Sequence, residues 1–202
     1  MPKITCISVQ QKNKNRCNLF VDEQFFASLS LELVYKYRLK EGQDIEPDKL
    51  NDIISKNERQ DALVKATNYI AKAIKTKRQV KDYLLKKGYS EEIAYYCIDK
   101  LKEYKYIDDV DYSKRFINSY SSNQGKKLLE YKLIEKGVKK QDIECAFENS
   151  EVDYLQNAIS VAKKYLKNKE LNFETKAKAY RYLISKGFSY DEANSALSQF
   201  FN

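Results

Sequence analysis

The sequence predicts a mainly helical protein, a tandem array of three three-helix repeats preceded by a small N-terminal β-meander and a helix. Apolar residues alternate with period two in the first 45 residues and recur at helical spacing from about residue 50 onward. A Lys-Gly motif occurs three times, with its glycines 49 and 50 residues apart. The 202 residues include only 2 Pro and 5 Gly, too few for a turn-rich all-β protein.

Three short strands are predicted in the N-terminal region. Residues 5–9 alternate with period two, and residues 17–21 and 25–29 are short segments of strand-forming residues. Residues 12–15 are rich in Asn, which tolerates turn conformations, and residues 22–23 form a second turn candidate. Short strands joined by such turns predict an antiparallel meander. These strands could dock onto the first repeat or provide an extra partner contact.

A helix is predicted after the third strand, because apolar side chains recur there at helical spacing, at Leu31, Val34, Tyr35 and Leu39. Gly42 is predicted to close this helix, since glycine adopts the left-handed conformation of a helix terminus at little cost. The sequence thus assigns residues 1–50 to an N-terminal β-rich extension, followed by repeats at 58–107, 108–150 and 151–202.

Each repeat is predicted to contain three helices, with the glycine corner joining the second helix to the third. The first helices are expected at about residues 59–74, 110–121 and 152–167. Helices of about three turns are too short to be stable alone in water, so packing between them must stabilise each repeat. Stacked repeats of this kind offer long surfaces instead of one deep pocket, which favours binding over catalysis.

The corner motif has two aliphatic residues, a polar residue, Lys, Gly and an apolar residue, at positions 84–89, 133–138 and 183–188. We expect each helix to end at the Lys, with the Gly in the left-handed conformation and the next residue packing back. Ser90 and Ser189 are candidate N-caps for the following helices. The pairs Thr76 with Gln79 and Ser189 with Glu192 have the spacing of a capping box.

The composition argues against an enzyme, a cofactor and a metal site. The chain has no His, which removes the commonest general base and metal ligand. The cluster of Asp108, Asp109 and Asp111 could hold Mg²⁺, but helix capping is the better interpretation. Gly125-Lys126 lacks the glycine and hydroxyl residue that a phosphate-binding loop needs.

The expected compartment is the cytoplasm, with no membrane contact. The N-terminus lacks the apolar stretch of a signal peptide, and no run of about 18 apolar residues is present. The four Cys are widely spaced and are expected to be reduced, with Cys97 and Cys145 buried among apolar residues. The abundant Tyr residues, among them Tyr83, Tyr104 and Tyr180, are expected to pack in cores.

The whole chain has a formal net charge of +8, and its positive charge is concentrated in one segment. Residues 58–107 hold 12 basic and 7 acidic side chains, whereas residues 108–150 hold 8 of each. Five basic residues lie within ten positions: Lys72, Lys75, Lys77, Arg78 and Lys81. Such a cluster attracts phosphates or an acidic protein surface, although a solvated helix end is the simpler alternative.

The chain resembles the RecX family, bacterial modulators of the RecA recombinase, and most clearly so at residues 107–147. This segment has the acid pair 108–109, the aromatic-basic segment 112–116, Gly125 and the corner 133–138 of the family's central repeat. The strand region is similar to the N-terminal extension of Gram-positive members. The resemblance covers nearly the whole chain.

The sequence also departs from the family pattern. Gln79 stands where the family usually has an acid, and Ala73 stands near the position of a frequent arginine. Residues 168–174 resemble an insertion in the last repeat.

The resemblance implies a non-enzymatic inhibitor that binds along the groove of the RecA–DNA filament, and we expect the protein to be a monomer. It would restrain the ATPase, strand-exchange and co-protease activities of RecA in DNA repair, homologous recombination and the SOS response. Direct, non-specific contact with single- or double-stranded DNA is a further expectation. The expected contact residues are basic: Lys72, Lys75, Lys77, Arg78, Lys81, Arg115, Lys126 and Lys127. The alternative is a general nucleic-acid-binding helical repeat protein.

Overall fold

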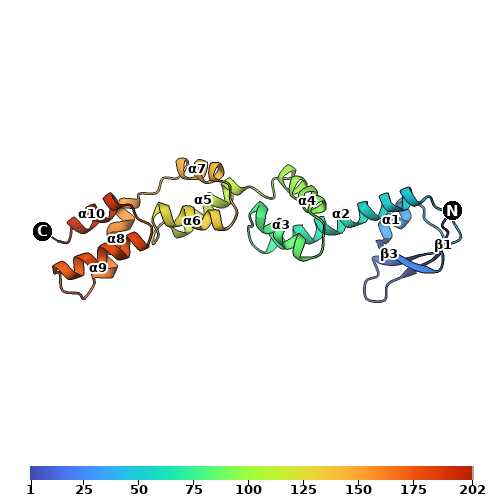
Figure 1. The fold of residues 1–202 in the computed structure, drawn as a ribbon, viewed down its shortest axis with the longest axis horizontal. Helices are drawn as coiled ribbons and strands as arrows, with labels where there is room; N and C mark the ends of the chain where they lie inside the picture. Colours follow the sequence, from blue (N-terminus) through green and yellow to red (C-terminus); the bar gives the residue numbers. More distant parts are fainter. Residues whose placement is uncertain (202) are drawn as a thin grey trace. The chain divides into compact units, whose positions relative to one another are not determined.

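The structure is a computed structural model that describes residues 1–201. It divides into two compact units, and each is described separately below. The first unit comprises Met1–Tyr69 and Tyr83–Lys100, and the second comprises Ile70–Asp82 and the chain from Leu101 onward. The order of strands and helices along the chain is followed by colour in Figure 1.

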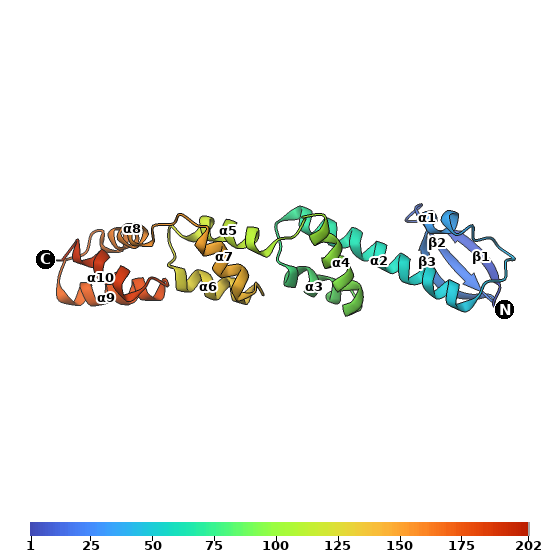
Figure 2. The ribbon, with the colours of Figure 1, turned by 90° about the horizontal axis from the view of Figure 1, so that it is seen from above.

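The N-terminal strands form the predicted antiparallel meander. Strands β1 (Ile4–Val9), β2 (Arg16–Val21) and β3 (Gln24–Ser30) lie side by side in the order β1-β2-β3 (Figure 2). The turn between β2 and β3 places Asp22 and Glu23 at φ 48° and 67°, the left-handed conformation that a tight hairpin turn requires. Buried apolar side chains from these strands and from the following helices form a single core.

Helix α1 (Leu31–Lys36) is shorter than predicted. Its N-cap is Ser30, whose hydroxyl accepts a hydrogen bond from the Leu33 N–H. The prediction that Gly42 closes this helix is wrong, because Arg38 already takes the left-handed conformation at φ 51°. Gly42 is also left-handed, but it lies in a separate turn and donates its N–H to the Ile4 carbonyl at 2.8 Å.

Helix α2 (Pro47–Lys72) is one continuous helix, where the sequence analysis predicted a helix starting near residue 59. Pro47 occupies the first helical position, where its missing N–H costs nothing. No further Pro or Gly interrupts the segment. Leu50 and Ile53 are buried in the core of the N-terminal sheet, so packing stabilises the added turns.

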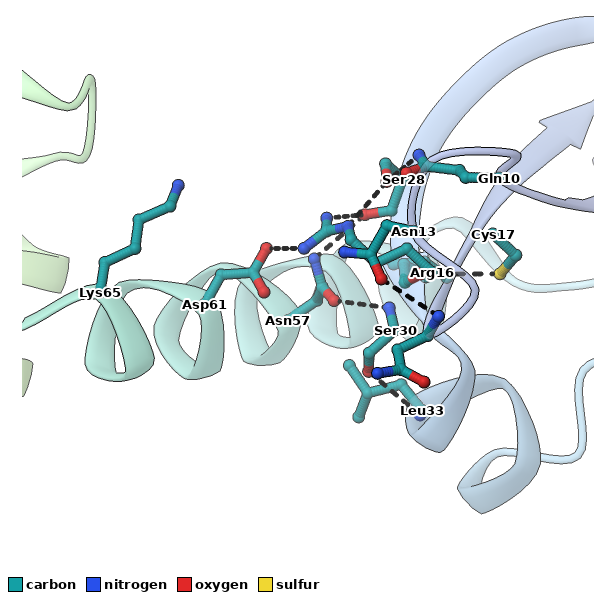
Figure 3. A network of polar contacts seen from close by, with 12 residues as sticks. Gln10, Asn13, Arg16, Cys17, Ser28, Ser30, Leu33, Asn57, Asp61 and Lys65 are labelled. Atoms are coloured by element: carbon teal, nitrogen blue, oxygen red, sulfur yellow. Dashed lines mark hydrogen bonds and ion pairs between the residues drawn. The ribbon is translucent and has the colours of Figure 1, made fainter. Parts of the chain in front are cut away.

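A polar network fastens the sheet to α2 (Figure 3). The Asn57 side chain accepts from the Ser30 N–H at 3.0 Å and donates to the Ser28 carbonyl at 3.1 Å. Arg16 of β2 forms an ion pair with Asp61 one turn further along α2 and also donates to the Ser28 carbonyl at 3.0 Å. The N-terminal strands therefore dock onto the helix that continues into the first repeat.

Three helical repeats follow, as predicted, and Figure 1 shows their helices in chain order. The first repeat uses the end of α2, with α3 (Lys77–Lys86) and α4 (Glu91–Glu103). The second consists of α5 (Asp109–Tyr120), α6 (Lys126–Glu135) and α7 (Lys140–Glu148). The third consists of α8 (Tyr154–Leu166), α9 (Phe173–Ser185) and α10 (Tyr190–Ser198).

The corner glycines adopt the predicted conformation, with φ of 87°, 80° and 87° at Gly88, Gly137 and Gly187. In each corner the next residue donates its N–H back to the carbonyl five positions earlier, as the Val138 N–H does to the Leu133 carbonyl at 3.1 Å. Val138 and Phe188 are buried and close the cores of the second and third repeats. Ser189 forms the full predicted capping box with Glu192.

Two burial predictions are wrong. Cys97 is buried, but Cys145 is exposed on α7, because Ile143, Ala146 and Phe147 supply the buried face of that short helix. Tyr104 is exposed beyond the end of α4.

Candidate functional site

A repeated contact holds successive repeats together within the second unit. The residue just before the second helix of one repeat docks onto the Lys-Gly corner of the next. The Thr76 hydroxyl donates to the Lys136 carbonyl at 2.8 Å, and the Gly125 N–H donates to the Lys186 carbonyl at 2.9 Å. Thr76 and Gly125 occupy equivalent places, one residue ahead of α3 and α6.

Thr76 also caps α3, as predicted. The Thr76 N–H donates to the Gln79 side chain at 3.1 Å, and the Gln79 N–H donates to the Thr76 hydroxyl at 3.2 Å. This reciprocal pair is a capping box, with Gln in place of the usual acid. The first turn of α3 is therefore fixed against the corner of the second repeat.

Lys77 adds an ionic contact at the same junction. Its N–H donates to Asp109 at 3.0 Å, and its ammonium lies 3.7 Å from both Asp109 and Asp142. The Asp109 side chain is only 2% exposed, and this burial raises its pKa although Lys77 opposes the shift. Lys77 thus holds two repeats together. In the same acid cluster, Asp108 caps α5, as predicted, by accepting from the Val110 and Asp111 N–H groups.

A groove opens beside this junction. Its volume is about 550 Å³, and it is lined by residues of α3, α5, α6 and the following corner: Arg78, Gln79, Asp82, Phe116, Tyr120, Lys132, Glu135 and Lys136. We call it the Arg78 groove. Arg78, Lys132 and Lys136 bring three positive charges to it, against the carboxylates of Asp82 and Glu135.

The side chain of Arg78 is positioned by the corner glycine. A Cβ atom on Gly137 would lie 2.0 Å from the Arg78 Cδ, so only glycine leaves room for the arginine stem. The exposed Arg78 guanidinium lies 3.8 Å from Asp82, one turn further along α3. A solvated pair of this kind is weak, so the guanidinium can exchange it for another anion.

Aromatic rings on α5 contribute the apolar part of the Arg78 groove. Phe116 and Tyr120 contact each other with ring centroids 4.6 Å apart. The Lys136 ammonium lies 5.7 Å above the Phe116 ring. The groove therefore combines cations with apolar rings, a combination suited to an anionic protein surface or to nucleic acid.

The structure distributes the eight sequence-predicted contact residues over several places. Lys72 is exposed at the end of α2, and Lys75 and Lys81 are half-buried. Arg115 is exposed on α5, where it pairs with Asp111 at 2.9 Å. Lys77 lies in the ionic contact described above.

Lys126 and Lys127 lie beside the junction of the second and third repeats. Their ammonium groups sit 5.0 Å and 5.1 Å above the rings of Phe147 and Tyr190. Only Arg78 of the eight lines the Arg78 groove, where it meets Lys132 and Lys136.

Sequence reasoning missed Lys132, Lys136 and the two aromatic residues as parts of one site. The signal was present, because Lys136 belongs to the corner motif and Phe116 and Tyr120 are four residues apart on one helix. What the sequence alone does not give is which corner the start of α3 docks against. Within residues 1–201, no helix is both long and apolar enough to cross a membrane.

The family model described as the RecX N-terminal domain matches residues 2–46, and models of the first and third three-helix domains match residues 62–101 and 151–197. The regulatory protein RecX of Clostridium botulinum (strain Alaska E43) is 36% identical over 100% of this chain and 98% of the relative. The chain belongs to the RecX family.

Other RecX proteins give the same result. That of Clostridium tetani is 34% identical over 98% of this chain and 94% of its own length, and that of Bacillus licheniformis is 31% identical over 98% and 78%. These organisms confirm the resemblance to Gram-positive RecX members. A crystal structure of regulatory protein RecX has the same fold, with a TM-score of 0.74, 19% identity and coverage of 98% of this chain and 100% of that one.

Proposed function

We propose that this protein is a modulator of the RecA recombinase that binds along the groove of the RecA–DNA filament. It restrains ATP hydrolysis, strand exchange and co-protease activity, and so acts in homologous recombination, DNA repair and the SOS response. Support comes from membership of the RecX family over the whole chain. The observation that carries the proposal is the Arg78 groove, a cationic and aromatic surface at a junction between repeats.

The chemistry of the Arg78 groove fits an anionic partner. A guanidinium forms paired hydrogen bonds with a carboxylate or a phosphate, and Lys132 and Lys136 add positive charge beside it. Phe116 and Tyr120 provide apolar area next to these charges. A RecA filament on DNA presents both protein and phosphate surfaces, so the groove can engage either component.

Contacts at more than one junction should raise the affinity for a RecA filament. Lys126 and Lys127 at the next junction lie on the same unit as Arg78, and a partner with repeated subunits can meet both places at once. Several weak contacts on one chain then give strong binding without any single deep site. We retain Lys72, Lys75, Lys81 and Arg115 as further proposed contacts.

Inhibition follows from preferential binding. A ligand shifts a conformational equilibrium only as far as its affinities for the two states differ. A protein that prefers one filament geometry therefore slows every step that requires the other, and the ATPase cycle depends on such steps. No catalytic group is needed for this effect.

A second candidate function is general, non-specific binding to single- or double-stranded DNA. The net charge of +8 and the lysines near the end of α2 favour it. Cosedimentation separates the two functions. The protein is spun with RecA filaments on single-stranded DNA, and with the same DNA without RecA, at several salt concentrations.

The RecA proposal predicts that the protein pellets with filaments at salt where binding to bare DNA is lost. Equal binding to filaments and bare DNA, with the same steep salt dependence, would instead support the second function. A variant with Arg78→Glu and Lys132→Glu should pellet less with filaments. A matched control with Lys139→Glu and Lys140→Glu changes charge equally at two exposed positions, the N-cap and the first residue of α7, and should bind as the unmodified protein does.

A further inference from the structure

The third repeat departs from the other two at the place where repeats dock. In the first and second repeats, the residue ahead of the second helix contacts a Lys-Gly corner, through Thr76 and Gly125. The equivalent residue of the third repeat is Asn172, whose side chain caps α9 by accepting from the Thr175 N–H at 2.9 Å. The connections ahead of these helices contain four, five and six residues in the three repeats.

The longer connection builds one wall of a second groove. This groove has a volume of about 670 Å³ and is lined by residues of α8, the α8–α9 connection and the segment after α10: Ser160, Lys163, Lys164, Leu166, Lys167, Lys169, Leu171 and Phe200. We call it the Leu171 groove. Its connection residues Lys169 and Leu171 lie in the segment 168–174, which the resemblance to the RecX family predicts to be an insertion.

The lining of the Leu171 groove is apolar with a cationic border. Leu166, Leu171 and Phe200 supply apolar surface, and the rest of the lining is Ser160 and four lysines, with no acidic residue. Leu171 is 54% exposed and lies in this lining. A contiguous apolar surface bordered by polar side chains is typical of a protein-binding site.

We propose that the Leu171 groove binds a segment of a partner protein in which carboxylates flank a large aliphatic side chain. Leu166 and Leu171 fit an aliphatic side chain, and four separated ammonium groups match several carboxylates spaced along a chain. The position supports this, since the connection ahead of the second helix already contacts another repeat of the chain in the first and second repeats.

Nucleic acid fits this groove less well. Bases stack on flat aromatic faces, and the groove offers mainly aliphatic ones. The neighbouring Tyr165 ring already has the Lys169 ammonium 3.2 Å from its centroid, and it stacks on the Tyr182 ring with centroids 4.5 Å apart. This proposal does not depend on the proposed action on RecA, because it concerns the chemistry of the bound segment.

Fluorescence anisotropy with the full chain tests it. The probe is a labelled peptide of about twelve residues, with two leucines among aspartates and glutamates. Two control peptides replace either the leucines by serine or the acids by their amides. We expect both controls to bind at least about tenfold more weakly than the probe.

Variants locate the binding. Leu171→Ser should weaken binding of the probe about fivefold or more. Leu155→Ser, which changes an exposed leucine on α8 outside the groove lining, should leave binding unchanged. Lys163→Glu with Lys167→Glu should weaken it about tenfold, and the control pair Lys139→Glu with Lys140→Glu should not. All six positions are exposed, so these variants should fold normally.

The proposal fails if the probe binds equally with and without its leucines, or if Leu171→Ser leaves its affinity unchanged. It also fails if an oligothymidylate of similar charge binds and loses affinity in the Lys163 and Lys167 variant while the peptide does not bind. That result would assign the groove to nucleic acid.

Discussion

The hydroxyl of Thr76 donates a hydrogen bond of 2.8 Å to the carbonyl of Lys136, a residue 60 positions later in the chain. The same hydroxyl accepts the Gln79 N–H at 3.2 Å, so one side chain both starts α3 and joins two repeats. The Arg78 groove lies directly beside this contact. Its geometry therefore depends on how firmly the two repeats are docked.

Replacing Thr76 by valine should lower the free energy of unfolding by about 1–3 kcal/mol. Valine keeps the shape, but it removes the cap of α3 and leaves the Lys136 carbonyl without this donor. Urea denaturation measures the loss. Ser185→Ala is the control, because that exposed hydroxyl bonds only within its own helix, to the Tyr182 carbonyl. Equal losses in both variants would mean that the junction contact contributes nothing.

Gly125→Ala should destabilise the contact between the second and third repeats by about 2 kcal/mol or more. A Cβ on Gly125 would lie 2.3 Å from backbone atoms of Gly187, which cannot move as a flexible side chain can. Gly42→Ala is a useful comparison, because a Cβ at this position meets no atom within 4 Å. This variant suffers only the strain of its positive φ, about 1 kcal/mol. The melting temperature of Gly125→Ala should be lower than that of Gly42→Ala. The opposite order would exclude the close approach of Gly125 to the Gly187 backbone.

Asp109 should give the junction an unusual pH dependence. Burial raises its pKa, so the folded state holds this proton more tightly than the unfolded state does. The resulting stabilisation is present at low pH and is lost as the pH rises through the raised pKa. The unmodified protein should therefore lose stability relative to Asp109→Asn as the pH rises from about 4, the ordinary pKa of an aspartate, towards neutral.

Urea denaturation of both proteins across this pH range provides the measurement. If the unmodified protein instead gained stability over Asp109→Asn as the pH rose, attraction to Lys77 would outweigh burial. The direction of the change thus decides which of the two effects controls this carboxyl.

Asn57→Ala should loosen the N-terminal sheet from α2 and cost about 1–3 kcal/mol. Asn57 is only 4% exposed and satisfies both the Ser30 N–H and the Ser28 carbonyl. Hydrogen exchange should speed up in β3 more than in α8. Gln60→Ala, which removes an exposed contact with Glu32, should leave the exchange of β3 unchanged. If exchange in β3 were as slow in Asn57→Ala as in the unmodified protein, this docking contact would be contradicted.

Much of the fold follows from local patterns in the sequence. The corner glycines, the capping boxes of Thr76 and Ser189 and the hairpin turn at Asp22 each depend on a few neighbouring residues. The end of α1 could not be predicted as easily, because Arg38 adopts a left-handed conformation that sequence rules expect at Gly42. The length of α2 depends on packing of Leu50 and Ile53 against a sheet distant in sequence.

The candidate site was predicted only in part, for the same reason. Charge clustering predicted Arg78 as a contact residue, but it also predicted Lys77, which pairs with Asp109 and Asp142 instead. These acids lie 32 and 65 positions further along the chain, so only the stacking of repeats brings them to Lys77. Lys132 and Lys136 join Arg78 through the same stacking. The Leu171 groove depends on the α8–α9 connection, whose shape no local pattern describes.

The most direct test of the proposed function is the DNA-dependent ATPase of RecA, titrated with this protein below one copy per RecA subunit. We expect strong inhibition by the unmodified protein and by the Lys139→Glu, Lys140→Glu control. Inhibition by Arg78→Glu with Lys132→Glu should be about tenfold weaker, with an unchanged free energy of unfolding. An ATPase rate that the unmodified protein leaves unaltered would mean that this protein does not modulate RecA.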